Sequence, residues 1–224
     1  MERKGLLKEA LTKFFSGVIL LGALLFLPAG DAGWKNGWIL MAALFIPMFF
    51  AGILMLAKAP DLLRSRLKAK ETQSEQKDVI RYSGIMFLAS FVTAGLNHRF
   101  QWISMPAAVS WAGILVFLLG YCMLGEVLRE NQYLSRVIEV QENQSVVDTG
   151  LYGIVRHPMY SATVLLFLSM PLILDSLPSF VIMLAYIPII TKRIRNEEAV
   201  LEAELQGYSE YKKKVRCRLI PFVW

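Results

Sequence analysis

The sequence predicts an all-α integral membrane protein with about six transmembrane segments, and three observations indicate that fold class. Hydrophobic residues make up 55% of the 224 residues and charged residues only 19%, below the roughly 25% of an average soluble domain. Several apolar runs approach the about 20 residues that a helix needs to cross the hydrocarbon core. The 24 Lys and Arg residues flank these runs instead of forming one stripe, which argues against nucleic acid as a partner.

The first four predicted spans are apolar runs that are long enough to cross a membrane. Lys13 is the only charge in the first run, near its start, where it can reach the headgroups. The third run is the weakest, because Arg81 lies close to its start. The second and fourth runs contain no charged residue. The four runs cover residues 11–28, 37–57, 79–96 and 103–125.

The last apolar stretch, residues 159–191, is too long for one span. A single straight helix of this length would measure roughly 50 Å, well beyond the hydrocarbon core. Asp175 is its only charge, and Pro171 together with residues 174–178 (LDSLP) signals a turn. The stretch is therefore predicted to form a short helical hairpin, which supplies spans five and six.

The basic residues predict the orientation of the chain in the membrane. Only Lys35 and Arg99 fall on one side of the predicted spans, and the other twenty-two of the 24 Lys and Arg residues fall on the opposite side. Because cytoplasmic loops carry the excess of Lys and Arg, we expect a multi-pass protein with both termini and the 58–81 linker in the cytoplasm.

The chain is predicted to be one domain, residues 1–224. Residues 1–135 would supply spans one to four, and residues 136–224 would form the cofactor-binding and catalytic part around the hairpin. No metal is expected, since the two cysteines have no metal-ligand spacing.

Two polar stretches, residues 141–160 and 192–211, flank the hairpin on its cytoplasmic side. A hairpin returns its end near its start, so Arg156–Tyr160 and Arg193–Glu198 should be neighbours. Ionisable groups this close to a membrane are costly and are functional candidates. The pattern predicts a cytoplasmic pocket for a polar, charged cofactor.

Individual side chains in these stretches have suitable chemistry for such a cofactor. Tyr152 and Tyr160 offer aromatic faces for an adenine or, through cation–π attraction, a sulfonium. Glu197 or Glu198 can accept hydrogen bonds from ribose hydroxyls or an ammonium group. Arg193 and Arg195 offer planar forks for a carboxylate. The alternative without ligand binding is that these basic residues only anchor the helix at the membrane face, and that Tyr208 and Tyr211 form an interfacial aromatic belt.

Four motifs in the C-terminal part resemble the isoprenylcysteine carboxyl methyltransferase family and the related phospholipid methyltransferases. They are GLYGIVRHPMY at residues 150–160, RxRxEE at 193–198, GYxxY at 207–211 and RLIP at 218–221. The first four spans agree with this family only as generic hydrophobic helices.

The resemblance implies S-adenosyl-L-methionine as cofactor, in a pocket closed by cytoplasmic segments and open laterally to the bilayer. It also implies that Arg193 positions the substrate, and Arg193 is the single catalytic residue that we assign. Arg195 is a second candidate for substrate binding, on the chemistry of its side chain alone. The cofactor contacts that it implies are Gln141, Gln144, Ser145, Val146, Val147, Tyr152, His157, Pro158, Met159, Tyr160 and Glu197, to which the sequence adds Glu198.

The expected function is methyl transfer to a lipophilic or amphiphilic small molecule at the cytoplasmic membrane face. An isoprenylcysteine-type carboxylate, an isoprenoid, a lipid amine and a thiol are all compatible acceptors, and membrane lipids are the expected surroundings. Two alternatives stay open. The first is an NADPH-dependent membrane oxidoreductase, because sterol reductases resemble the same C-terminal pattern. The second is a membrane protein without enzymatic activity, such as a transporter.

Overall fold

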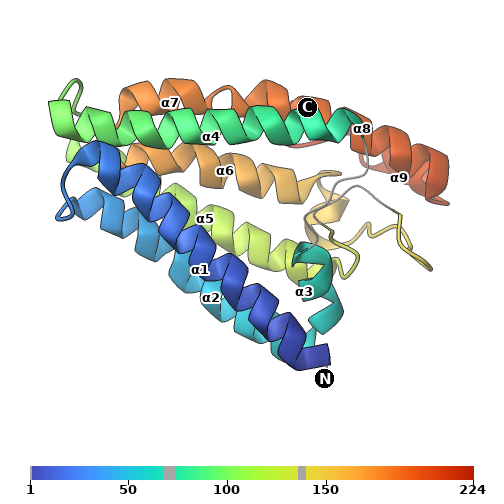
Figure 1. The fold of residues 1–224 in the computed structure, drawn as a ribbon. Coiled ribbons are helices and arrows are strands. Elements are labelled where there is room, and N and C mark those ends of the chain that lie inside the picture. Colours follow the sequence, from blue (N-terminus) through green and yellow to red (C-terminus); the bar gives the residue numbers. More distant parts are fainter. Residues whose placement is uncertain (1, 68–73, 136–139) are drawn as a thin grey trace.

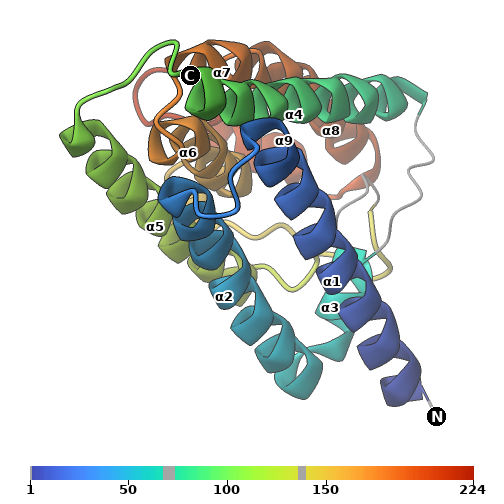
Figure 2. The same cartoon turned by 60° about the vertical axis from the view of Figure 1, so that its left-hand side comes forward.

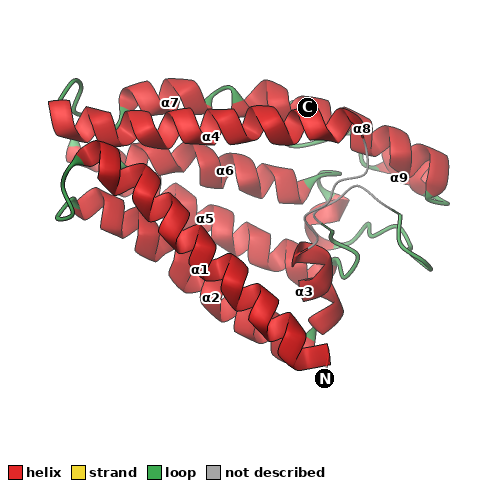
Figure 3. Cartoon of the chain, in the orientation of Figure 1, coloured by secondary structure: helices red, strands yellow, loops and turns green. Residues whose placement is uncertain are grey.

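The described part of the chain is entirely helical. The computed structural model describes residues 2–67, 74–135 and 140–224, and every regular element in these ranges is a helix (Figures 1 and 3). This confirms the predicted all-α class for the described residues. The predicted 58–81 linker includes residues 68–73, and the predicted boundary between residues 135 and 136 adjoins residues 136–139. Both of these segments lie outside the described residues.

Within the described residues, five helical segments are long and apolar enough to cross a membrane, namely Lys4–Ala29, Lys35–Lys58, Lys77–Phe100, Ala107–Glu130 and Leu177–Glu204. The sixth apolar helix has only 16 residues. The elements in chain order are α1 (Glu2–Ala29), α2 (Lys35–Lys58), α3 (Pro60–Leu67), α4 (Ser74–Phe100), α5 (Ala107–Glu130), η1 (Gly150–Gly153), α6 (Pro158–Ile173), α7 (Leu177–Met183), α8 (Tyr186–Glu204) and α9 (Tyr208–Lys214).

The predicted hairpin is present, but its two arms differ in length. α6 is short, whereas the returning arm, α7 followed by α8, continues to Glu204, well past the predicted end at residue 191. Asp175 lies in the turn with a left-handed φ of +55°. Its carboxylate accepts a hydrogen bond from the Met105 backbone N–H at 2.6 Å, and Ser176 caps α7 through the Ser179 N–H. The prediction that Asp175 marks the turn is confirmed.

The helices form two groups that meet at one end of the molecule. Figures 1 and 2 show α1 and α2 side by side, diverging from α4 toward the N-terminus. α1 crosses α4 where a Cβ on Gly95 would lie 2.7 Å from the Leu25 carbonyl oxygen. Leu25, Phe117 and Ile173 are almost fully buried in the shared core.

α5 and α6 pack against each other most closely, and this contact positions the start of α6. A Cβ on Gly113 would lie 2.9 Å from the Leu172 Cβ, and one on Gly120 would lie 2.9 Å from the Leu166 Cγ. In a bilayer the hydrophobic effect does not drive helices together, because the lipid tails are as apolar as the side chains. Small residues such as these glycines let the helices approach closely enough to gain van der Waals contact. The start of α1, α3, η1 and α9 lie toward the same end of the molecule, on the right in Figure 1, which we call the site end.

Candidate active site

A small cavity lies at the site end, between the start of α6, the middle of α8 and the segment that joins α5 to η1. Its volume is about 100 Å³. Polar and aromatic side chains make up much of its wall. The lining residues are Asn131, Tyr133, Leu134, Ser135, Gln144, Ser145, Val146, Val147, Tyr152, Arg156, His157, Met159, Tyr160, Arg193, Glu197, Leu201, Leu205, Tyr208 and Tyr211.

The start of α6 is held in place by the last ten residues of the chain, which we call the C-terminal strap (residues 215–224). Pro158 is the first residue of α6, where a missing N–H costs nothing and the fixed φ suits a helix. The backbone N–H groups of Arg156 and His157 donate to the carbonyl oxygens of Cys217 and Arg218, both at 2.9 Å. The strap therefore satisfies backbone donors that precede the helix.

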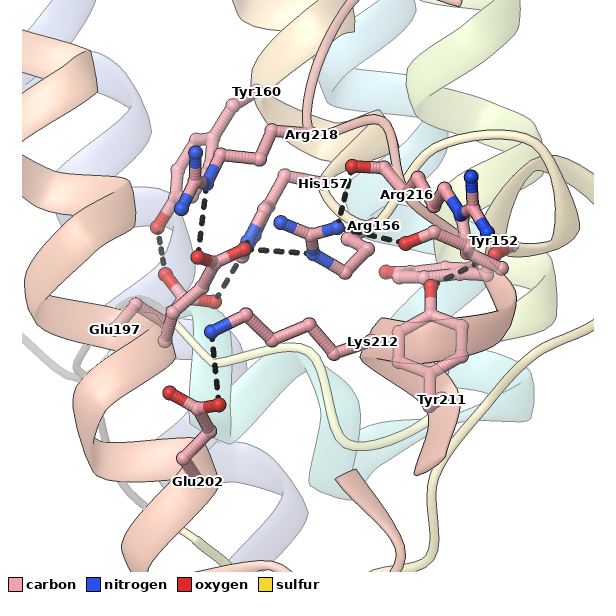
Figure 4. A network of polar contacts seen from close by, with 12 residues as sticks. Tyr152, Arg156, His157, Tyr160, Glu197, Glu202, Tyr211, Lys212, Arg216 and Arg218 are labelled. Atoms are coloured by element: carbon pink, nitrogen blue, oxygen red, sulfur yellow. Dashed lines mark hydrogen bonds and ion pairs between the residues drawn. The ribbon is translucent and has the colours of Figure 1, made fainter. Parts of the chain in front are cut away.

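A buried ion pair ties the strap to α8 (Figure 4). Arg156 and Glu198 are 5% and 3% exposed, and Arg156 Nε lies 2.8 Å from Glu198 Oε1. The Arg156 guanidinium also donates to the Val215 and Arg216 carbonyl oxygens at 2.7 Å. Arg218 Nε donates to Glu198 Oε2 at 2.9 Å. A buried pair persists only when its remaining donors and acceptors find partners, and here Nε and Nη1 of Arg156 and both carboxylate oxygens of Glu198 have them.

A second polar group, Tyr160 with Glu197 and Arg193, faces the cavity. The Tyr160 hydroxyl donates to Glu197 Oε2 and accepts from Arg193 Nε at 2.9 Å. The Arg193 guanidinium lies 5.9 Å from the centre of the Tyr160 ring, and the His157 ring stacks on that ring at 5.7 Å. Glu197 and Arg193 are one helical turn apart on α8, so both reach the same wall.

Three tyrosines from η1 and α9 line the cavity as well. The Tyr211 hydroxyl donates to the Tyr152 carbonyl oxygen at 2.8 Å, and the Tyr152 hydroxyl accepts from Asn131 Nδ2 at 3.0 Å. Burial raises the pKa of Tyr152 to about 12, so its phenol is neutral at physiological pH. Tyr208 and Tyr211 are only 4% and 6% exposed. The burial of both side chains argues against the alternative of an aromatic belt at the lipid interface, because α9 folds back against η1.

The cavity collects most of the residues that the sequence singled out. Those that line it are Gln144, Ser145, Val146, Val147, Tyr152, His157, Met159, Tyr160, Arg193 and Glu197.

Four other candidates lie elsewhere. The Gln141 side chain donates to the Tyr133 carbonyl oxygen at 2.6 Å. Pro158 is buried in the first turn of α6, and Glu198 faces Arg156. Arg195 is exposed on the other side of α8.

Several lining residues were not predicted as site residues. Asn131, Tyr133, Leu134 and Ser135 follow α5 and carry no motif, and only the docking of this segment brings them to the cavity. Leu201 and Leu205 continue the α8 face that carries Glu197 and could have been found from helical spacing. Among the described residues, no group of three or more His, Cys, Asp or Glu side chains could hold a metal ion.

Comparisons with known proteins give one family match, which overlaps this part of the chain. Residues 108–206 match the family model described as phospholipid methyltransferase. No curated protein matches the sequence. A solved structure of the eukaryotic intramembrane Ras methyltransferase, isoprenylcysteine carboxyl methyltransferase, is similar at 18% sequence identity and a TM-score of 0.49. That match covers 95% of this chain and 85% of the other. The segment matched by the family model runs from α5 through α8 and contains Arg156, Tyr160 and Glu197.

Proposed function

We propose that this protein is a membrane methyltransferase, which transfers a methyl group from S-adenosyl-L-methionine to a lipophilic or amphiphilic acceptor at the cytoplasmic end of the bundle. The observation that carries the proposal is the cavity wall formed by Tyr160, Arg193 and Glu197. The Tyr160 hydroxyl is bonded to both of the other side chains at the end of an apolar helical bundle. A charged cofactor and the polar head of a lipid can both reach such a site while an apolar tail stays among the helices.

The side chains around the cavity suit the cofactor. The Glu197 carboxylate can accept hydrogen bonds from an ammonium group or from ribose hydroxyls, and the Tyr160 and Tyr152 rings offer flat surfaces. The cavity of about 100 Å³ is smaller than the roughly 300 Å³ or more of ordinary ligand pockets. We therefore expect cavity side chains such as Met159 and Arg193 to move apart when the cofactor binds.

The protein's main task in the reaction is alignment. The bound cofactor supplies an electrophilic methyl group on a sulfonium. Arg193 would bind an anionic acceptor and hold it in line with that methyl group, since a guanidinium binds carboxylates and phosphates through two parallel hydrogen bonds. Tyr160 fixes the Arg193 side chain from one side through its hydroxyl. A carboxylate or thiolate acceptor needs no general base, so the site requires none for these substrates.

Binding measurements on the detergent-purified protein test the proposal directly. Calorimetric titration with S-adenosylhomocysteine should show saturable binding, and titration with NADPH should match the buffer control. Binding of NADPH alone would favour the membrane oxidoreductase, and no binding of either compound would favour a protein without this enzymatic activity. Incubation with cofactor carrying a labelled methyl group and a total lipid extract, followed by mass spectrometry, would then identify the acceptor.

A further inference from the structure

The hydroxyl group of Tyr208 has no partner within the described residues. Tyr208 is 4% exposed and lines the cavity. In residues 2–67, 74–135 and 140–224, its hydroxyl and the Asn196 side-chain nitrogen are the only buried side-chain polar atoms without a hydrogen bond. An unsatisfied buried hydroxyl costs about 1–3 kcal/mol, so native proteins rarely keep one without a reason.

The neighbouring tyrosine shows that this orphan hydroxyl is particular to Tyr208. Tyr211 lies one helical turn further along α9, with its ring centre 5.8 Å from that of Tyr208. Its hydroxyl is bonded to the Tyr152 carbonyl oxygen at 2.8 Å. Burial raises the pKa of both phenols well above its usual value, so both are protonated at physiological pH and able to donate.

The wall around Tyr208 differs in character from the wall around Tyr160. Tyr208 packs in an apolar cluster with Leu205 and Tyr211, against which Val146 and Leu201 lie. These residues present aliphatic and aromatic surface to the cavity. Elsewhere in the cavity, Arg193 and Glu197 are bonded to Tyr160 and provide charged groups. The cavity therefore has an apolar wall that suits a flat base and a charged wall that suits an amino acid.

We propose that the Tyr208 hydroxyl binds the nucleoside half of S-adenosylmethionine, whose amino-acid half lies toward Arg193 and Glu197. This assignment rests on the function proposed above and names a cofactor-binding residue. The purine packs between Val146, Leu201 and Leu205, and a ring nitrogen or sugar hydroxyl of the nucleoside satisfies the orphan phenol. The Tyr208 hydroxyl, which has no hydrogen-bond partner in the free enzyme, would then gain the bound nucleoside as its partner.

The substitution Tyr208→Phe tests the proposal, because it should weaken ligand binding without lowering the stability of the ligand-free protein. Binding of S-adenosylhomocysteine, measured by calorimetry on the full-length protein in detergent, should weaken about fivefold, the equivalent of one neutral hydrogen bond. Binding of 5′-methylthioadenosine, which keeps the nucleoside and lacks the amino acid, should weaken by the same factor. The melting temperature of the ligand-free variant should be unchanged or higher, because an unsatisfied group is removed.

Tyr211→Phe is the matched control, because it removes a hydroxyl that is already bonded within the protein. That variant should lower the melting temperature of the ligand-free protein. If Tyr208→Phe binds S-adenosylhomocysteine as the wild type does, the Tyr208 assignment is overturned while the proposed function stands. Weakened binding of S-adenosylhomocysteine without weakened binding of methylthioadenosine, or no methylthioadenosine binding by the wild type, would overturn the nucleoside assignment. A wild type that does not bind S-adenosylhomocysteine would instead refute the proposed function.

Discussion

At the scale of single residues, the neighbouring glutamates Glu197 and Glu198 have different surroundings. Successive residues on a helix point about 100° apart, so one side chain faces the cavity when the next faces the strap. Glu198 is surrounded by Arg156, His157 and Arg218 and is 3% exposed. Glu197 is 23% exposed at its side chain and reaches Tyr160. The geometry thus assigns a structural ion pair to Glu198 and supports a ligand contact for Glu197.

The substitution Glu197→Gln should weaken cofactor binding without unfolding the protein. Loss of a charge-assisted hydrogen bond costs about 1.5–3 kcal/mol, which is roughly ten- to a hundredfold in affinity. Calorimetry with S-adenosylhomocysteine measures the change. Glu202→Gln is the control on the same helix, since Glu202 pairs with Lys212 and does not line the cavity. An unchanged dissociation constant in Glu197→Gln would remove this residue from the cofactor site.

Substitutions at Arg193 should separate acceptor positioning from cofactor binding. Arg193→Ala should reduce turnover at least tenfold, because the acceptor loses a charge-assisted contact, with little change in the affinity for S-adenosylhomocysteine. Arg193→Lys should recover only part of the activity, since an ammonium keeps the charge but loses the planar fork. Arg195→Ala is the control, because Arg195 is exposed away from the cavity. Equal loss of cofactor binding in both Arg193 variants would place Arg193 in the cofactor pocket instead.

At the scale of helices, the site depends on how closely α5 approaches α6. α6 begins with the residues that line the cavity and is shorter than the five helices able to cross a membrane, so its position depends on its neighbour. Gly113 and Gly120 lie on the α5 face that touches α6, with no room for a Cβ. The C-terminal strap holds the other side of the same helix, where the Ser161 hydroxyl donates to the Leu219 carbonyl oxygen at 2.7 Å.

Enlarging Gly113 should therefore destabilise the bundle. In Gly113→Ala the new Cβ would lie 2.9 Å from the Leu172 Cβ and 3.1 Å from the Ile173 backbone nitrogen, so α5 and α6 must shift apart. Overpacking of this kind costs about 1–3 kcal/mol. Gly125→Ala is the control on the same helix, because a Cβ added there would have no neighbouring atom within 4 Å. Thermal unfolding in detergent should show a lower midpoint for Gly113→Ala only, and equal midpoints would contradict the close contact.

At the scale of the whole molecule, the chain alternates between the two ends of the bundle. The turns after α1, α4 and α6 lie at the end opposite the site, and the N-terminus, α3, η1 and α9 lie at the site end (Figure 1). Lys212, Lys213 and Lys214 of α9 are at the site end, whereas Lys35 begins α2 at the opposite end. This arrangement agrees with the distribution of Lys and Arg from which we expect the site end to be cytoplasmic.

Cysteine labelling tests that orientation. In a background that lacks Cys122 and Cys217, Lys35→Cys should react with a membrane-impermeant thiol reagent added to intact cells. Lys213→Cys should react only after the membrane is opened. Both lysines are exposed, so accessibility of the side chain does not limit either reaction. The reverse pattern would show that the site faces away from the cytoplasm.

The sequence by itself determined the helical class, the first four long apolar helices and the hairpin turn at Asp175, whereas the predicted fifth span is a helix of only 16 residues. These features depend on residues that are close in sequence. Helix hydrogen bonds link residues four apart, and a proline or a charged residue interrupts an apolar run at its own position. The same reasoning placed the Arg156–Tyr160 element beside Arg193–Glu198, since a hairpin must return its end near its start. The return arm was underestimated, because α8 continues as a helix through polar residues that hydropathy does not register.

Only the tertiary structure decided which of these side chains meet. The rotation of α8 separated Glu197 from Glu198, and the docking of α9 buried Tyr208 and Tyr211, for which the sequence had left a position at the membrane interface open. Arg156 can be buried beside Glu198 because the C-terminal strap, about sixty residues away in sequence, supplies carbonyl oxygens that accept hydrogen bonds from its guanidinium group. These hydrogen bonds offset part of the cost of removing the charge from water. Such contacts join residues far apart in the chain, and no local pattern encodes them.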